Sequence, residues 1–101
     1  YKSLDNILQK GAADVLIIKP TLTGGVEDIK KIIKTAQKEG LRTILTSSFE
    51  TNIAQGFILH LIASLRITEH CGIFNINLYD ETIPKIIKDY CKVPQSNGLG
   101  L

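Results

Sequence analysis

The chain is short, at 101 residues, and its charge is nearly balanced, with a formal net charge of +2 at pH 7. Such a small charge does not indicate binding to nucleic acid or to an anionic membrane, and no apolar run is long enough to span a bilayer. No signal peptide is visible. The chain contains no methionine, and its first residues have the pattern of the middle of a helix. We therefore expect a piece of a larger protein.

The first predicted elements are a helix and a strand. Residues 3–10 carry apolar side chains at helical spacing, and Gly11 supplies the stop. Residues 15–18 form an apolar run that is closed by Lys19 and Pro20. Such a run predicts a strand that is buried on both faces and that ends where the proline removes a backbone donor.

A second helix and a second strand follow a predicted loop at residues 19–25. Residues 26–39 have an apolar stripe and a lysine-rich outer face, which predicts an amphipathic helix with a solvated side. Gly40 ends this helix. Residues 43–45 then predict a second buried strand.

The same pattern repeats before the rhythm of the chain changes. We expect a loop at residues 46–52, a helix at residues 53–65 and a third short strand at residues 73–76. Residues 83–93 are expected to form two short strands or extended segments, because Pro84 argues against one long helix. The predicted apolar stripe of the third helix comprises Phe57, Ile58, Leu61, Ile62 and Leu65.

The alternation of helices and strands with short connections predicts an α/β fold with a parallel sheet. Three strand units cannot close a barrel of about eight strands. The chain is therefore either an open doubly wound sheet or part of a larger barrel, and the second interpretation accounts better for strands buried on both faces.

Lys19 is the leading candidate for a functional residue, because the carboxyl ends of barrel strands carry the active site. A lysine there is a possible base, Schiff-base former or electrostatic clamp. Gly24 and Gly25 precede a helix and are a weaker candidate for a phosphate-binding turn. His60 and His70 have no acid or nucleophile at a useful spacing, and we expect His60 to be a packing residue.

The two cysteines, Cys71 and Cys91, lie 20 residues apart and show no CxxC spacing. A metal site needs about four well-spaced ligands. We therefore expect free, partly buried thiols.

Three blocks of the sequence resemble the enolase superfamily and, within it, the o-succinylbenzoate synthase branch of menaquinone and phylloquinone synthesis. They are IKPTLTG at residues 18–24, TSSFET at residues 46–51 and NGLG at residues 97–100. The resemblance covers nearly the whole chain and corresponds to the last third of such an enzyme.

The resemblance implies a role for several residues. Lys19 corresponds to the lysine of the sixth barrel strand, which stabilises an enediolate opposite a base lysine on the second strand. The implied substrate-binding residues are Thr46, Ser47, Ser48, Glu50 and Gly72. For Glu50, capping of the following helix is an equally good interpretation. Gly72 would begin the eighth strand.

The resemblance also implies the setting of the reaction. The fold would be a TIM-type (β/α)7β barrel, with its last three strands in residues 1–79 and a tail at residues 80–101 that packs on a capping domain. The enzyme would be a hydro-lyase that uses Mg²⁺ and a small carboxylate substrate, in the cytoplasm or the plastid stroma. The magnesium ligands and the base lysine would lie outside this chain, so the chain alone should be inactive and should need the rest of the barrel. No nucleic-acid or membrane partner is implied, and the oligomeric state is open.

Two departures from the branch leave alternatives open. Ala54 stands where a glycine is usual, and residues 73–77 lack the usual glycine-rich eighth strand. The alternatives are an N-acylamino acid racemase or dipeptide epimerase of the same superfamily and a non-catalytic half-barrel that acts as an interaction module. A third alternative is a small open sheet that binds phosphate at Gly24 and Gly25.

Overall fold

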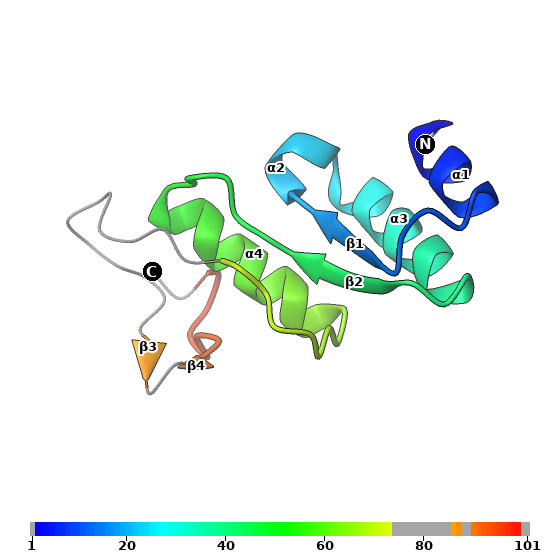
Figure 1. Ribbon diagram of the computed structural model, residues 1–101. Coiled ribbons are helices and arrows are strands. Elements are labelled where there is room, and N and C mark those ends of the chain that lie inside the picture. The colour runs from blue at the N-terminus through cyan, green and yellow to red at the C-terminus, as the bar shows by residue number, and fades with distance from the viewer. Residues whose placement is uncertain (1, 74–85, 88–89, 100–101) are drawn as a thin grey trace.

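The computed structural model describes residues 2–73, 86–87 and 90–99 (Figure 1). The elements follow one another along the chain as α1 (Lys2–Gln9), β1 (Val15–Ile18), α2 (Pro20–Thr23), α3 (Val26–Lys38), β2 (Arg42–Leu45), α4 (Asn52–Ser64), β3 (Ile86–Ile87) and β4 (Tyr90–Cys91). This order confirms the predicted α/β class. None of the helices in the described part of the chain has the length and apolar composition that crossing a bilayer requires.

The strands pair as the sequence predicts. β1 and β2 are parallel, with Val15 opposite Arg42 and Ile18 opposite Leu45. A single parallel bridge joins Thr46 to Gly72, the residue before the third strand that was predicted at residues 73–76. Residues 74–76 of that prediction lie outside the described residues, so they leave it untested. β3 and β4 form a short antiparallel pair within the segment for which two short strands were predicted.

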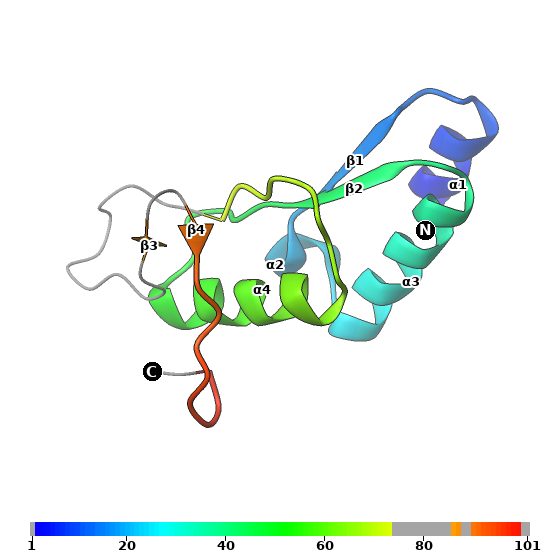
Figure 2. The same ribbon diagram turned by 90° about the horizontal axis from the view of Figure 1, so that it is seen from below.

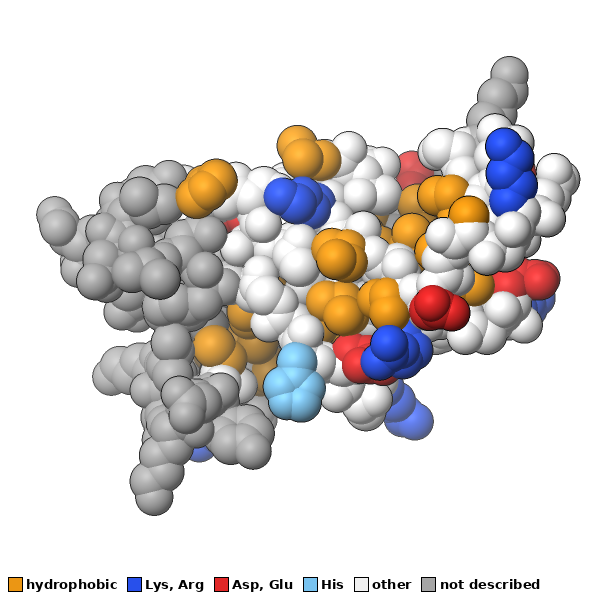
Figure 3. Space-filling model, viewed as in Figure 1, with side chains coloured by type: hydrophobic (Ala, Val, Ile, Leu, Met, Phe, Trp, Pro, Cys, Tyr) orange, Lys and Arg blue, Asp and Glu red, His pale blue; other side chains and the backbone are white. Residues whose placement is uncertain are grey.

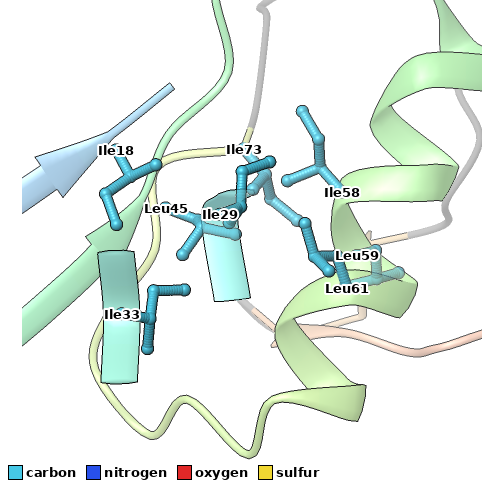
Figure 4. Close-up of a cluster of buried hydrophobic side chains, with 8 residues drawn as sticks. All are labelled: Ile18, Ile29, Ile33, Leu45, Ile58, Leu59, Leu61 and Ile73. Carbon is cyan, nitrogen blue, oxygen red and sulfur yellow. The ribbon is translucent and has the colours of Figure 1, made fainter. Parts of the chain in front are cut away.

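The core lies between the parallel strands and the helices α3 and α4, which cover the same face of the sheet (Figure 2). Leu45 and Ile58 are fully buried, and Ile29 is 1% exposed. The cluster of buried side chains comprises Ile18, Ile29, Ile33, Leu45, Ile58, Leu59, Leu61 and Ile73 (Figure 4). Cys91 and Val93, which follow in the tail, pack against this cluster.

The opposite face of the two strands is open in the described structure. Side chains alternate along a strand, so this open face carries Val15 and Ile17 from β1 and Arg42 and Ile44 from β2. Ile17 is 61% exposed. Figure 3 shows hydrophobic side chains gathered over these strands, with a basic side chain beside them toward α2. The prediction that the first strand is buried on both faces is therefore wrong for this chain, because both helices pack on one side.

Glycine ends two of the helices, as predicted. Gly11 and Gly40 have φ angles of +54° and +80°, a region in which residues with a Cβ are strained. Hydrogen bonds from Ala12 N to Ile7 O and from Leu41 N to Ala36 O close the last turns of α1 and α3. This is the Schellman arrangement, which satisfies helix carbonyls that lack an intrahelical partner.

Two local predictions are wrong. Residues 19–25 are not all loop, because Pro20 begins the short helix α2, where its missing N–H costs nothing and its fixed φ suits the first helical position. In α4, Phe57 is 36% exposed whereas Leu59 is 5% exposed. Apolar residues occur on every side of this helix, so periodicity does not define its buried side, and packing against the sheet decides it.

The cysteines conform to the prediction. Cys71 and Cys91 are free and half-buried. Burial raises the pKa of each thiol above its ordinary value of 9.0. Both are therefore protonated at neutral pH and behave as small apolar side chains.

Candidate active site

The candidate site lies at the carboxyl ends of the parallel strands, where Lys19, Thr46 and Gly72 come together at one edge of the sheet. Thr46 N donates to Ile18 O at 2.9 Å, and Gly72 N donates to Leu45 O at 3.1 Å. These bonds place the residues that follow β1 and β2 next to each other. A Cβ at Gly72 would lie 3.4 Å from Thr46 Cγ2, so the chain passes close to this threonine.

Lys19 occupies the boundary between β1 and α2. Its backbone is still extended, with φ −104° and ψ 100°. Because side chains alternate along a strand, Lys19 lies on the same face as Ile17, and this is the open face of the sheet. The carbonyl of Lys19 accepts from Leu22 N and Thr23 N, each at 3.0 Å, and from Thr23 Oγ1 at 2.7 Å. The lysine is exposed, but its backbone is firmly held.

The loop at residues 46–51, called the β2 loop below, carries most of the other predicted site residues. The hydroxyl oxygens of Thr46 and Ser48 are buried and have no hydrogen-bond partner among the described residues. Ser47 N donates to Gly72 O at 2.8 Å. A buried hydroxyl without a partner is costly, so these two side chains are suited to receive a polar group from outside the described structure.

Glu50 connects the two strand ends. Its side chain is buried, and the whole residue is 7% exposed. Glu50 Oε1 accepts from the Thr21 hydroxyl at 2.6 Å, and Glu50 Oε2 accepts from Ser48 N. Its backbone carbonyl accepts from Gln55 Nε2 at 3.1 Å. One carboxylate thus joins α2 to the β2 loop across 29 residues of sequence.

The environment keeps Glu50 ionised. Burial raises the pKa of this carboxyl, but the hydrogen bonds from the Thr21 hydroxyl and the Ser48 amide, together with the charge of Lys19, outweigh burial. The net result is a pKa below the ordinary value of 4.5. The Glu50 carboxylate is therefore a buried negative charge that lies near enough to the Lys19 ammonium for the two to attract.

The interpretation of Glu50 as a helix cap is wrong. Thr51 is the N-cap of α4, and its side chain accepts from Ala54 N at 3.5 Å. The residue before Glu50, Phe49, has φ +63° and is 74% exposed. A bulky residue in this left-handed conformation marks local strain in the loop.

The remaining candidates do not join this group. Gly25 is the N-cap of α3, and Gly24 has φ +132°, so the glycine pair serves the turn into that helix. His60 Nε2 lies 3.4 Å from Leu99 O, which fits the predicted packing role. His70 is exposed on the connection after α4.

Magnesium does not fit the described residues of this chain. Within residues 2–73, 86–87 and 90–99, no three His, Cys, Asp or Glu side chains gather where they could hold a metal ion. The chemistry available here is that of Lys19, the β2 loop and Glu50.

Thr21 is the site residue that the sequence did not single out. It lies in the IKPTLTG block, but a threonine in such a turn has many ordinary roles. Its partner Glu50 lies 29 residues further along the chain, in the β2 loop. Only the resemblance of the two sequence blocks to one family pointed to both segments together.

The fold and this edge define an α/β chain with a candidate active site at the carboxyl ends of parallel strands. A family model described as "Enolase C-terminal domain-like" matches residues 1–101. The chain therefore belongs to this family, whose members are mostly enzymes.

Individual relatives are more distant. The chain is 30% identical over 77 residues to the o-succinylbenzoate synthases of two Vibrio cholerae serotype O1 strains, M66-2 and ATCC 39315 / El Tor Inaba N16961. The match covers 76% of this chain and 22% of each relative, so the chain spans less than a quarter of their length. No solved structure gives a significant match.

Proposed function

We propose that the chain is the C-terminal part of an o-succinylbenzoate synthase-like hydro-lyase. The observation that carries the proposal is the position of Lys19, at the carboxyl end of β1 and on the open face, next to the β2 loop with its two buried hydroxyls. An ammonium group on this face and adjacent hydroxyls are suited to a carboxylate substrate. Membership of the enolase-like family and the similarity to the Vibrio enzymes support it.

The proposed reaction is a dehydration of a cyclohexadiene carboxylate. A base lysine outside this chain removes the proton alpha to the carboxylate, and the electron pair moves into an enediolate. The Lys19 ammonium stabilises the new negative charge, an interaction that is much stronger in a water-poor site than in bulk water. The hydroxyl group takes up a proton and leaves as water, and a carbon–carbon double bond forms. The proposal places the magnesium ligands outside this chain as well.

The rest of the enzyme is part of the proposal. Residues 1–79 would supply the last three strand units of a TIM-type barrel, and residues 80–101 would return to a capping domain. The open face of β1 and β2 would then face the barrel interior, which would cover Ile17, exposed by 61% in this chain. The partners would be the remaining barrel and a small carboxylate, in the cytoplasm or the plastid stroma.

The same open face supports a second candidate function. Exposed apolar side chains on a strand face favour association with another chain. A non-catalytic interaction module built on this face would need no base and no metal. Concentration-dependent association of the 101-residue chain would favour this candidate, and a well-behaved monomer would count against it.

The deciding experiment is Lys19→Ala in the intact protein that carries this chain. We expect turnover to be lost while the circular dichroism spectrum stays unchanged. The control is Lys38→Ala at the exposed end of α3, which should retain turnover. Product analysis separates the chemistries, because dehydration yields an aromatic ring whereas a racemase or epimerase only inverts a stereocentre. Normal turnover in Lys19→Ala would refute the role given to this lysine.

A further inference from the structure

We propose that Glu50 is a positioning residue, whose carboxylate fastens the turn that begins at Lys19 to the β2 loop. Glu50 would act through Lys19 and would not contact the substrate. The inference rests on the proposed function, because it needs Lys19 to act on the substrate. It adds a role for Glu50 and Thr21 together.

The connection on the β1 side is short and rigid. Lys19 is the N-cap of the four-residue helix α2, and Thr21 is the second residue of that helix. Three donors, Leu22 N, Thr23 N and Thr23 Oγ1, converge on the Lys19 carbonyl. Whatever holds Thr21 therefore holds the backbone of Lys19. The Thr21 hydroxyl donates to Glu50 Oε1 at 2.6 Å, a charge-assisted hydrogen bond of the strong kind.

The connection on the β2 side is equally firm. Glu50 Oε2 accepts from Ser48 N, and the Glu50 carbonyl accepts from Gln55 Nε2 in the first turn of α4. Gln55 is itself 5% exposed. Glu50 is thus fixed to the β2 loop, to α4 and to α2 at the same time.

The bond between Ser48 N and Glu50 Oε2 also closes the tight turn that contains Phe49. A phenylalanine at φ +63° persists only where its surroundings determine the backbone on both sides. The Glu50 side chain supplies that constraint, since it binds the residue immediately before Phe49. The shape of the β2 loop and the place of Lys19 therefore depend on the same carboxylate.

Charge argues against direct contact between Glu50 and the substrate. The proposed substrate is a carboxylate, and the Glu50 carboxyl is ionised, so the two would repel each other. A buried carboxylate that accepts bonds from Thr21 and Ser48 acts instead from behind the site. Its negative charge also lies near enough to Lys19 for the two to attract.

The test is a double-mutant cycle in the intact protein, with Thr21→Val, Glu50→Gln and the two combined. We expect each single variant to lower kcat by about 10- to 100-fold, since misplacement by about 1 Å can cost that much, while KM changes less than about threefold. The combined variant should be no slower than the slower single one, because both remove the same connection. Thr21→Ser keeps the hydroxyl and should restore near-normal kcat. Glu27→Gln, at an exposed carboxylate of α3 that pairs with Lys30, is the matched control and should be silent.

The opposite pattern would overturn the inference. If Glu50→Gln raised KM and Thr21→Val had no effect, or if the two effects were additive, Glu50 would be acting on the substrate directly. The proposed function would instead be refuted if the unmodified intact protein did not dehydrate the proposed substrate, or if Lys19→Ala had normal turnover.

A second measurement does not need activity. Breaking the connection should speed amide hydrogen exchange at Leu22 and Thr23, whose N–H groups bind the Lys19 carbonyl, in both Thr21→Val and Glu50→Gln. Exchange at Ile33 in the buried side of α3 should stay as in the wild type. Unchanged exchange at Leu22 and Thr23 in both variants would disprove the positioning role, whatever reaction the protein catalyses.

Discussion

At the scale of single residues, Glu50 makes the stability of the fold depend on pH. Its pKa in the folded chain is below the ordinary value of 4.5, so the folded state binds the proton less tightly than the unfolded state. The stabilisation is therefore fully present above about pH 4.5 and is lost as the pH falls through the folded pKa.

The comparison of wild type with Glu50→Gln tests this pH dependence. At pH 7 we expect the free energy of unfolding to fall by about 1.5–3 kcal/mol in the variant, the typical contribution of hydrogen bonds to a charged group. The difference should shrink as the pH is lowered from 5 toward 3. Urea denaturation at each pH measures it, and a difference that does not change with pH would contradict the assignment.

Arg66 is the residue at which the backbone is strained without an evident gain. It has φ +52° and occupies the place after α4 that Gly11 and Gly40 occupy after α1 and α3. Arg66 N donates to Ala63 O, and Ile67 N donates to Ile62 O, so the Schellman arrangement is intact.

We expect Arg66→Gly to stabilise the fold by about 0.5 kcal/mol. Relief of the left-handed strain is worth about 1–2 kcal/mol, but glycine gives back about 0.5–1 kcal/mol through the entropy of the unfolded chain. Thermal or urea denaturation of the variant measures the net effect, and Arg66→Ala, which keeps the strain, is the control. A glycine variant no more stable than the alanine variant would mean that the strain is negligible.

The positions of the candidate site residues at the strand ends were easier to predict from the sequence than the hydrogen bonds between them. Lys19 and the β2 loop stand out because each follows a strand, which is a local feature. The bond between Thr21 and Glu50 joins residues 29 positions apart, and no local pattern specifies it. The positive φ of Phe49 could not be predicted from the sequence either, because a left-handed conformation is normally expected at glycine or asparagine and not at phenylalanine.

At the scale of elements, helix boundaries and strand order were predictable because periodicity and glycine stops are local. The short helix α2 was missed, since Pro20 is as typical of a strand end as of a first helical turn. The buried side of α4 was predicted only in part. The predicted stripe includes Phe57, which is 36% exposed, and omits Leu59, which is 5% exposed. It correctly includes Ile58, which is fully buried, and omits Ile53, which is 59% exposed. Their burial depends on the sheet, which the helix sequence does not describe.

Ile53 and Ile58 together give a test of how α4 packs. In the 101-residue chain we expect Ile58→Ala to cost about 2–5 kcal/mol, because it removes buried methyl groups and leaves a cavity. Ile53→Ala should change stability by less than about 0.5 kcal/mol. Ile58→Val, with an expected cost of about 0.5–1.5 kcal/mol, serves if the alanine variant does not fold. Equal costs at the two positions would mean that α4 packs on a different side.

At the scale of the whole molecule, the two-stranded parallel sheet is covered by helices on one face and is open on the other. In the described part, β1 pairs with β2 alone, and the helices α3 and α4 cover the same face. Ile17, Leu22 and Phe49 are exposed by 61%, 75% and 74% and lie on or beyond the carboxyl half of the strands. Exposed apolar side chains at these positions are suited to contact with a further part of the protein or with another chain.

The last prediction asks whether the proposed barrel covers this face, using Ile17 and Ile29 as matched isoleucines. Ile29 is 1% exposed and should cost about 2–5 kcal/mol when changed to alanine in any context. Ile17→Ala should cost less than about 0.5 kcal/mol in the 101-residue chain, where the side chain is open. In the intact protein the same change should cost as much as Ile29→Ala, because the barrel interior would surround it. Urea denaturation of both variants in both contexts measures these costs. If Ile17→Ala is harmless in the intact protein too, the face stays open there, and the interaction module becomes the better account of this chain.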